Sequence, residues 1–289
     1  MSVWKPYIVL CRVYISLFAA CSAATGFFLF SPHRVPELLM TIAGVFLLAC
    51  GASALNQYQE QDIDAKMERT RQRPLPSGAI APARALSFSA ALVCAGQFLL
   101  AWAAGAPAFV LGLAALLWYN SIYTYLKRVT AFASVPGALV GIIPPAIGWV
   151  AAGGALSDPR LAAICFIFFM WQVPHFWLLV LHHGGEYEAA GLPSLTGIMS
   201  RPQISRITFA WIVSAAIASL ALPLYGSVRS PLVTLSFIPL AAWLIWGGRS
   251  LAMERPFSAS PPILFRKINL YLFCIMALLA LDSIFLIIP

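Results

Sequence analysis

Three side chains that carry oxygen ligands recur every fourth residue at the end of an apolar stretch: Asn56, Glu60 and Asp64. Residues spaced i, i+4 and i+8 lie on one face of a helix, so we expect these side chains to form one stripe. Carboxylate and amide oxygens suit a hard cation such as Mg²⁺, which also binds phosphate oxygens. The spacing therefore favours a Mg²⁺ site over its alternative, a loop whose carboxylates only balance nearby basic residues.

A basic segment follows the stripe, with the sequence Arg69-Thr70-Arg71-Gln72-Arg73-Pro74-Leu75-Pro76-Ser77-Gly78. Guanidinium groups bind phosphate oxygens in pairs, and the prolines and glycine favour a tight loop that folds Arg69 and Arg73 back over the stripe. Lys127 and Arg128, at the end of a later apolar stretch, would complete a phosphate cradle, although alone they would be ordinary membrane anchors. Together with the stripe, this segment predicts chemistry on a diphosphate.

A second polar group lies further along the chain, within Trp171-Gln172-Val173-Pro174-His175-Phe176-Trp177 and the following His182-His183-Gly184-Gly185-Glu186. A lone histidine in an apolar helix usually hydrogen-bonds a neighbouring helix, and its functional interpretation is a ligand or an acid–base group. Gly184-Gly185 argues against a continuous helix between His182 and Glu186. A zinc site of His182, His183 and Glu186 lacks a recognised protease spacing and is disfavoured.

Composition fixes the environment of these groups. The chain has 289 residues, of which 61% are hydrophobic and only 10% charged, and its mean hydropathy is +0.86. Such a chain is predicted to be an all-α, polytopic membrane protein, here with one transmembrane domain over residues 1–289 and no soluble domain. Since a span needs about twenty apolar residues, we predict nine spans: 7–30, 36–57, 83–104, 106–126, 131–153, 159–181, 206–225, 231–247 and 267–288.

The distribution of basic residues predicts orientation. With nine spans, 15 of the 18 Lys and Arg residues fall on the side of the N-terminus, and only Arg34, Arg160 and Arg229 fall opposite. The positive-inside rule therefore predicts a cytoplasmic N-terminus and large loops, with the C-terminus on the other side of a bacterial-type inner membrane. The net charge of +8 is explained by this topology and by contact with anionic membrane lipid, and does not indicate nucleic acid as a partner.

These motifs resemble those of the UbiA superfamily of intramembrane prenyltransferases, over roughly residues 40–210. The segments that carry the resemblance are NQYQEQDIDAKMERTRQRPLPSG (56–78), YTYLKRVT (123–130), GIIPPAIGW (141–149), WQVPHF (171–176) and EYEAAGLPSL (186–195). The combination of ERTRQRPLPSG, KRVT and PHF is similar to the branch that farnesylates haem. Lys5-Pro6 and Arg12 are separated here, whereas the family's N-terminal Thr-Lys-Pro-Arg signature joins them.

The resemblance implies nine helices in a ring around a central cavity, where Mg²⁺ held by two acidic motifs ionises an allylic diphosphate. It implies that Glu186 completes the metal site of Asn56, Glu60 and Asp64, and that His175 lies beside a porphyrin. Arg69, Arg73, Lys127 and Arg128 would hold the diphosphate. The implied substrates are farnesyl diphosphate and haem B, the implied product is haem O, and a haem-handling enzyme is a further implied partner.

Two alternatives stay open on the sequence. One is a prenyltransferase of the same superfamily that acts on a quinone precursor or a chlorophyll-type acceptor. The other is a membrane transporter or scaffold without catalytic activity, since paired polar helix ends that converge on one cavity also occur in transporters.

Overall fold

The computed structural model describes residues 4–253 and 261–285, which form helices and connecting turns without a strand among them. The prediction of an all-α membrane protein is confirmed. Within the described ranges, eight helical segments are long and apolar enough to cross a membrane. Their helices are α2 (Val13–Phe30), α3 (Val35–Gln59), α5 (Pro82–Leu116) with η1 (Leu117–Tyr123) and α6 (Thr124–Leu126), α7 (Ser134–Gly137) with η2 (Ala138–Ile142) and α8 (Ile143–Ala151), α9 (Pro159–Ala189), α11 (Arg201–Leu220), α12 (Pro231–Gly248) with η4 (Arg249–Leu251), and α13 (Pro261–Phe285).

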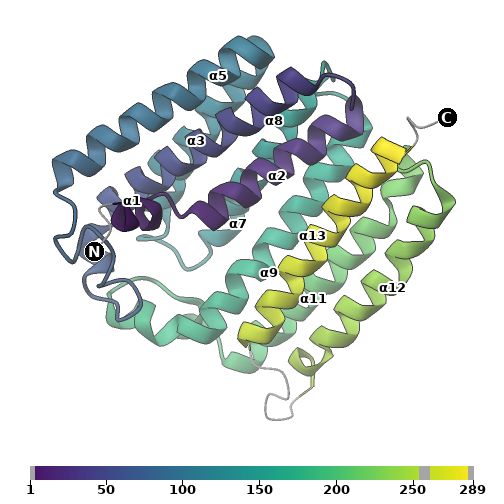
Figure 1. Ribbon diagram of the computed structural model, residues 1–289. Coiled ribbons are helices and arrows are strands. Elements are labelled where there is room, and N and C mark those ends of the chain that lie inside the picture. The colour runs from purple at the N-terminus through teal and green to yellow at the C-terminus, as the bar shows by residue number, and fades with distance from the viewer. Residues whose placement is uncertain (1–3, 254–260, 286–289) are drawn as a thin grey trace.

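Four shorter helices complete the described chain: α1 (Lys5–Leu10), α4 (Gln61–Asp64), α10 (Leu195–Ile198) and η3 (Leu222–Tyr225). The long helices run side by side in one bundle, with α1 near one end and the last turns of α13 at the opposite end (Figure 1). The largest apolar core joins α9, α11, α12 and α13, and smaller cores join α2, α3, α5 and α8.

The difference between eight segments and the nine predicted spans lies in α5. The predicted spans 83–104 and 106–126 fall within one segment of 45 residues, Pro82–Leu126. Gly105 interrupts that segment with φ 74° and ψ −172°, a backbone conformation outside the helical region that glycine adopts without a Cβ clash. The interruption coincides with the boundary between these two predicted spans.

Two other predicted spans are subdivided. The first, 7–30, is divided into α1 and α2 at Cys11 and Arg12, and Arg12 has a left-handed backbone with φ 45°. The fifth, 131–153, contains α7, a 3₁₀ turn and α8. Pro136, Pro144 and Pro145 lack backbone donors there, so a regular α-helical ladder is interrupted.

Two glycines allow α2 and α8 to approach closely. A Cβ added at Gly26 would lie 2.0 Å from the carbonyl oxygen of Pro145, and one at Gly148 would lie 1.8 Å from that of Ala23. Inside a bilayer the hydrophobic effect does not drive helices together, so membrane helices depend on such close packing of small residues. This contact fixes α2, which follows Arg12, against the middle of the bundle.

Candidate active site

The acidic stripe lies at a helix break. α3 ends at Gln59, Glu60 has φ −111° and ψ 8°, and α4 starts at Gln61. The prediction of one continuous helical stripe from Asn56 to Asp64 is therefore wrong in its backbone. Hydrogen bonds from Glu60 N to Asn56 O (3.0 Å) and from Asp64 N to Glu60 O (2.8 Å) nevertheless keep the i, i+4 relationship across the break.

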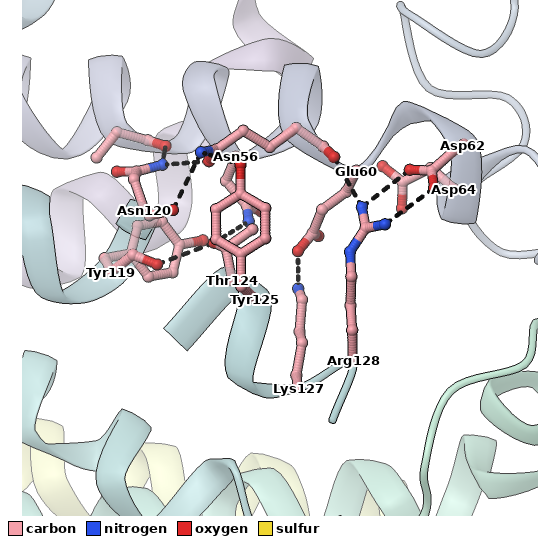
Figure 2. Close-up of polar contacts among 12 residues, drawn as sticks. Asn56, Glu60, Asp62, Asp64, Tyr119, Asn120, Thr124, Tyr125, Lys127 and Arg128 are labelled. Atoms are coloured by element: carbon pink, nitrogen blue, oxygen red, sulfur yellow. Dashed lines mark hydrogen bonds and ion pairs between the residues drawn. The ribbon is translucent and has the colours of Figure 1, made fainter. Parts of the chain in front are cut away.

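Both carboxylates of the stripe are buried and paired with predicted diphosphate ligands. Asp64 is 1% exposed, and Nη1 of Arg73 lies 2.7 Å from each of its carboxylate oxygens. Glu60 is 5% exposed and forms an ion pair with Nζ of Lys127, which reaches it from the end of α6 (Figure 2). Within these two ion pairs the charges balance. Each cation is held by a carboxylate whose place a phosphate oxygen could take.

Asn56 is anchored to the π-helical segment η1 and its neighbours. Its Nδ2 donates to Thr124 Oγ1 at 2.9 Å, and Asn120 Nδ2 donates to the α3 carbonyl of Ala52 at 3.0 Å (Figure 2). A π-helix places successive side chains differently from an α-helix and is common at functional sites. Here it turns Asn120 and Thr124 toward α3, which fixes Asn56 beside the buried carboxylates.

Arg128 occupies the rim of this group. Its guanidinium bonds both oxygens of Asp62 at 3.0 Å and the carbonyl of Gln59 at 2.8 Å. The Asp62 side chain is 57% exposed, so this pair lies in contact with water, and the Arg128 hydrogen bond lowers the pKa of Asp62. Arg128 therefore fastens the end of α6 to the α3–α4 break, which positions Lys127 below Glu60.

The second motif meets the first through Glu186. α9 is continuous from Pro159 to Ala189, so the predicted interruption at Gly184-Gly185 is wrong, and Glu186 lies in its last turn. Glu186 Oε2 accepts a hydrogen bond from the backbone N–H of Arg69 at 3.3 Å, and its Oε1 lies 3.1 Å from His183 Nδ1. The two polar groups, at the ends of the second and sixth predicted spans, therefore lie on the same side of the bundle.

An apolar cluster holds these two regions together. Ile63 and Met67, beside the first motif, pack with Tyr187, Ala190 and Leu192, beside the second. Ile63 and Met67 are buried, whereas the side chain of Arg69 between the motifs is exposed. The contact explains how a short polar loop keeps a fixed position over the carboxylates.

Arg12 is a site residue that sequence reasoning missed. Its Nη1 donates to the hydroxyl of Tyr119 at 3.3 Å, and its charge acts on Glu60, Asp64, Arg73 and Lys127. Its left-handed φ of 45° is unfavourable for an arginine, and such strain persists where the surrounding structure enforces it, often at functional sites. The sequence signal was the split Lys-Pro/Arg signature, in which we counted Arg12 only among the basic residues on the side of the N-terminus.

The basic residues of the site differ in how firmly they hold their protons. Burial lowers the pKa of Lys127, and Arg12 lowers it further, although Glu60 opposes both effects. Burial also lowers the pKa of Arg73, and the charge of Arg12 adds to that effect. Burial of Arg12 acts in the same direction, but Tyr119, Glu60 and Asp64 outweigh it and raise the pKa of Arg12. Of these three residues, Arg12 is therefore the one whose pKa is raised, so it keeps its positive charge most firmly.

His175 lies apart from this group, deeper along α9. Its imidazole packs against Phe265 of α13, with ring centroids 4.5 Å apart, and against Trp171 at 4.8 Å and Phe176 at 5.5 Å. The predicted porphyrin residue thus lies in an aromatic environment and is separate from the carboxylates.

The donor set fits Mg²⁺ in the way that diphosphate enzymes hold it. In the described part of the chain, no three His, Cys, Asp or Glu side chains are grouped to hold a metal by themselves. Mg²⁺ bound with a phosphate substrate uses only one or two protein carboxylates and takes its other ligands from phosphate and water. The buried oxygens of Glu60 and Asp64 satisfy that requirement.

Comparison with known proteins assigns the family. The UbiA prenyltransferase family matches residues 13–279. A protoheme IX farnesyltransferase from Geobacter sulfurreducens is 40% identical over 260 residues, covering 89% of this chain and 96% of the relative. One from Oleidesulfovibrio alaskensis is 35% identical over 273 residues, covering 94% of each chain.

The fold agrees with this assignment. A solved UbiA homologue from Archaeoglobus fulgidus, bound to GPP and Mg²⁺, has a TM-score of 0.72 to this structure at 14% identity, covering 95% of this chain and 98% of that one. Sequence and fold together support one conclusion: this chain belongs to the UbiA prenyltransferase family and is a membrane-embedded prenyltransferase.

Proposed function

We propose that this enzyme transfers a farnesyl group from farnesyl diphosphate to haem B, giving haem O, with the diphosphate bound where the two motifs meet. The hydrogen bond between Arg69 N and Glu186 Oε2 carries this proposal, because it brings both acidic motifs to one end of the bundle. The haem acceptor is supported by the relatives of 35–40% identity, which are named protoheme IX farnesyltransferases.

The ion pairs of the site suggest how the diphosphate is received. Arg73 is held by Asp64 and Lys127 by Glu60, so both positive charges are already fixed within the site. When a diphosphate enters, these cations exchange carboxylate oxygens for phosphate oxygens, and the carboxylates become free for a cation. Arg12 donates to the neutral hydroxyl of Tyr119 and forms no ion pair with a carboxylate among the described residues, so it adds a positive charge that needs no such exchange.

Asn56, Glu60 and Asp64, with Glu186 across the loop, are the residues that would hold Mg²⁺. When bound, the ion would neutralise part of the charge that develops on the leaving diphosphate. Arg12, Arg73 and Lys127 stabilise the same charge as the allylic C–O bond breaks, and they do so in a site shielded from water. Arg69 is exposed and meets the diphosphate from the water side.

The farnesyl carbon left by the diphosphate is an electrophile. Tyr119, Tyr123 and Phe176 form a run of stacked rings, with centroids 6.0 Å apart at each step, that leads from Arg12 toward His175. The faces of such rings stabilise a nearby cation, and the rings exclude water from it. A haem vinyl group attacks through its terminal carbon. The resulting cation beside the porphyrin takes up water and releases a proton, which gives the hydroxyethylfarnesyl substituent.

We further propose that the single domain crosses the membrane nine times, as a ring around a central cavity. The 45-residue segment Pro82–Leu126 would be about 67 Å long as one helix, more than twice the roughly 30 Å hydrocarbon core, and Gly105 interrupts it near its middle. Two crossings there make the total odd. An odd total supports termini on opposite sides of the membrane. With the excess of Lys and Arg on the side of the N-terminus, we propose a cytoplasmic N-terminus and active-site loops in a bacterial-type inner membrane.

The proposed function is tested with purified enzyme, haem B, Mg²⁺ and either farnesyl or geranylgeranyl diphosphate, with products separated by mass. The expected result is haem O with farnesyl diphosphate, which disappears when EDTA removes the metal. Prenylation of a quinone precursor with no conversion of haem B would contradict the acceptor, and full activity in EDTA would contradict the metal.

A further inference from the structure

His175 makes a directional contact with a side chain outside its own helix. Its Nδ1 lies 2.7 Å from Oδ1 of Asn269, which α13 brings beside α9 (Figure 1). The same helix pair is joined one turn away by Trp171 Nε1, which donates to the carbonyl of Ile268 at 2.9 Å. Asn269 is therefore held at a fixed position along α13, opposite the imidazole.

This contact selects one form of the imidazole. An amide oxygen accepts hydrogen bonds and cannot donate, so Nδ1 must carry the proton of neutral His175. Nε2 is then unprotonated and keeps its lone pair. Within the described ranges, no hydrogen bond joins Nε2 to a protein group, although Nδ1 is satisfied. A histidine serving only as a packing link would not need one nitrogen prepared in this way.

The surroundings of His175 indicate what Nε2 faces. Phe265, Trp171 and Phe176 surround the imidazole, and both His175 and Asn269 are only partly buried. From Phe176 the stacked rings of Tyr123 and Tyr119 continue to the hydroxyl that bonds Arg12. One continuous aromatic wall thus joins His175 to the cations at the mouth, so a flat acceptor at His175 lies within reach of the prenyl chain.

We propose that Asn269 is a positioning residue that holds His175 as its Nδ1–H tautomer, so that Nε2 binds the iron of the porphyrin acceptor. This inference rests on the proposed function, since haem B is the acceptor proposed there. Metal-binding histidines commonly donate their other N–H to a carbonyl or carboxylate, which fixes the ring and raises its basicity. A bond from His175 on α9 to the iron, with the imidazole oriented by Asn269 on α13, would hold the porphyrin in place. The vinyl edge would then stay open to the farnesyl carbon.

The test uses equilibrium binding of haem B without any prenyl diphosphate, so that the readout is independent of turnover. Optical and resonance Raman spectra of the purified protein report the iron ligand and its bond strength. In wild type we expect a histidine-ligated spectrum. His175→Ala should lose that signature, and added imidazole should restore it.

Asn269→Leu, similar in size but unable to accept, should weaken haem affinity by about 10- to 100-fold and shift the iron–histidine vibration. Asn269→Asp keeps an acceptor, so it should retain binding and strengthen the iron–nitrogen bond. Leu270→Ala is the matched control, because this neighbour on α13 is 52% exposed and faces away from the core. It should leave affinity and spectrum unchanged.

Two results would overturn the inference. One is a wild-type spectrum in His175→Ala, and the other is unaltered affinity and vibration in Asn269→Leu. Farnesyl transfer to haem B, measured on the same preparations, separates this failure from that of the proposed function. An enzyme that forms haem O without histidine ligation contradicts the iron bond of His175 and the role of Asn269 but leaves the proposed function intact, whereas ligation without any haem O contradicts only the function.

Discussion

The backbone N–H of Arg69 donates a hydrogen bond to Glu186 Oε2, 3.3 Å away, across 117 positions in the chain. Arg69 follows the acidic stripe at the end of α3, and Glu186 lies in the last turn of α9. Since the side chain of Arg69 is not needed for this bond, the loop itself is fixed over the site.

Asp64→Asn should reduce the turnover number by about 100-fold or more, because it removes a buried charge that stabilises the cations at the leaving group. The amide keeps the shape of the side chain, so the protein should still insert and purify as a folded enzyme. Glu68→Gln, in the same loop but 84% exposed, is the control and should keep nearly full activity. Steady-state kinetics on both variants decide the matter; equal rates for the two would contradict the role of Asp64.

Arg12→Gly should separate the effect of the strained backbone at this position from the effect of the guanidinium charge. Glycine adopts a φ of 45° freely, so we expect thermal stability to be maintained or increased. Loss of a charged hydrogen-bond donor to phosphate should raise the KM for farnesyl diphosphate by about 10- to 100-fold. Kinetics and thermal unfolding in detergent measure the two effects. If KM stayed unchanged, Arg12 would be a structural anchor only.

The spans and the acidic stripe were predictable because hydropathy and the i, i+4 spacing are local properties of the chain. The break at Glu60 was not, since it accompanies pairing with Lys127 from a helix that lies elsewhere in the sequence. The role of Arg12 was missed for the same reason: its contact with Tyr119 spans 107 positions. Asn269 gave no signal, because a single amide in an apolar helix has no spacing to reveal its partner.

The pH dependence of kcat/KM should reveal the contribution of Lys127. Burial lowers its pKa, so its ammonium loses the proton at a pH below the roughly 10.4 of an ordinary lysine. In the proposed function this charge binds the diphosphate, so affinity should be full at neutral pH and fall as pH rises through the lowered pKa. Lys127→Arg, which stays protonated, should move this alkaline fall in kcat/KM to higher pH. Lys66→Arg, at an exposed position just after α4, should not, and superimposable profiles for Lys127→Arg and wild type would refute the assignment.

Close packing of α2 on α8 should be sensitive to one methyl group. In Gly148→Ala the added Cβ would lie 1.8 Å from Ala23 O, so a backbone must shift, at a cost of about 1–3 kcal/mol. Gly185→Ala is the control, because nothing lies within 4 Å of its added Cβ. Thermal unfolding in detergent should show a lower midpoint for the first variant alone. Identical midpoints would mean that the helices do not approach as closely as described.

The most direct test of two motifs sharing one diphosphate is a double-mutant cycle on Mg²⁺-dependent binding of a non-hydrolysable farnesyl diphosphate analogue. Titration of wild type, Asp64→Asn, Glu186→Gln and the double variant gives the coupling free energy between the two carboxylates. We predict that each single variant weakens binding and that the two losses are non-additive by about 0.5–3 kcal/mol, as expected for residues with a common ligand. Strictly additive losses, or an unchanged affinity in Glu186→Gln, would contradict a shared site.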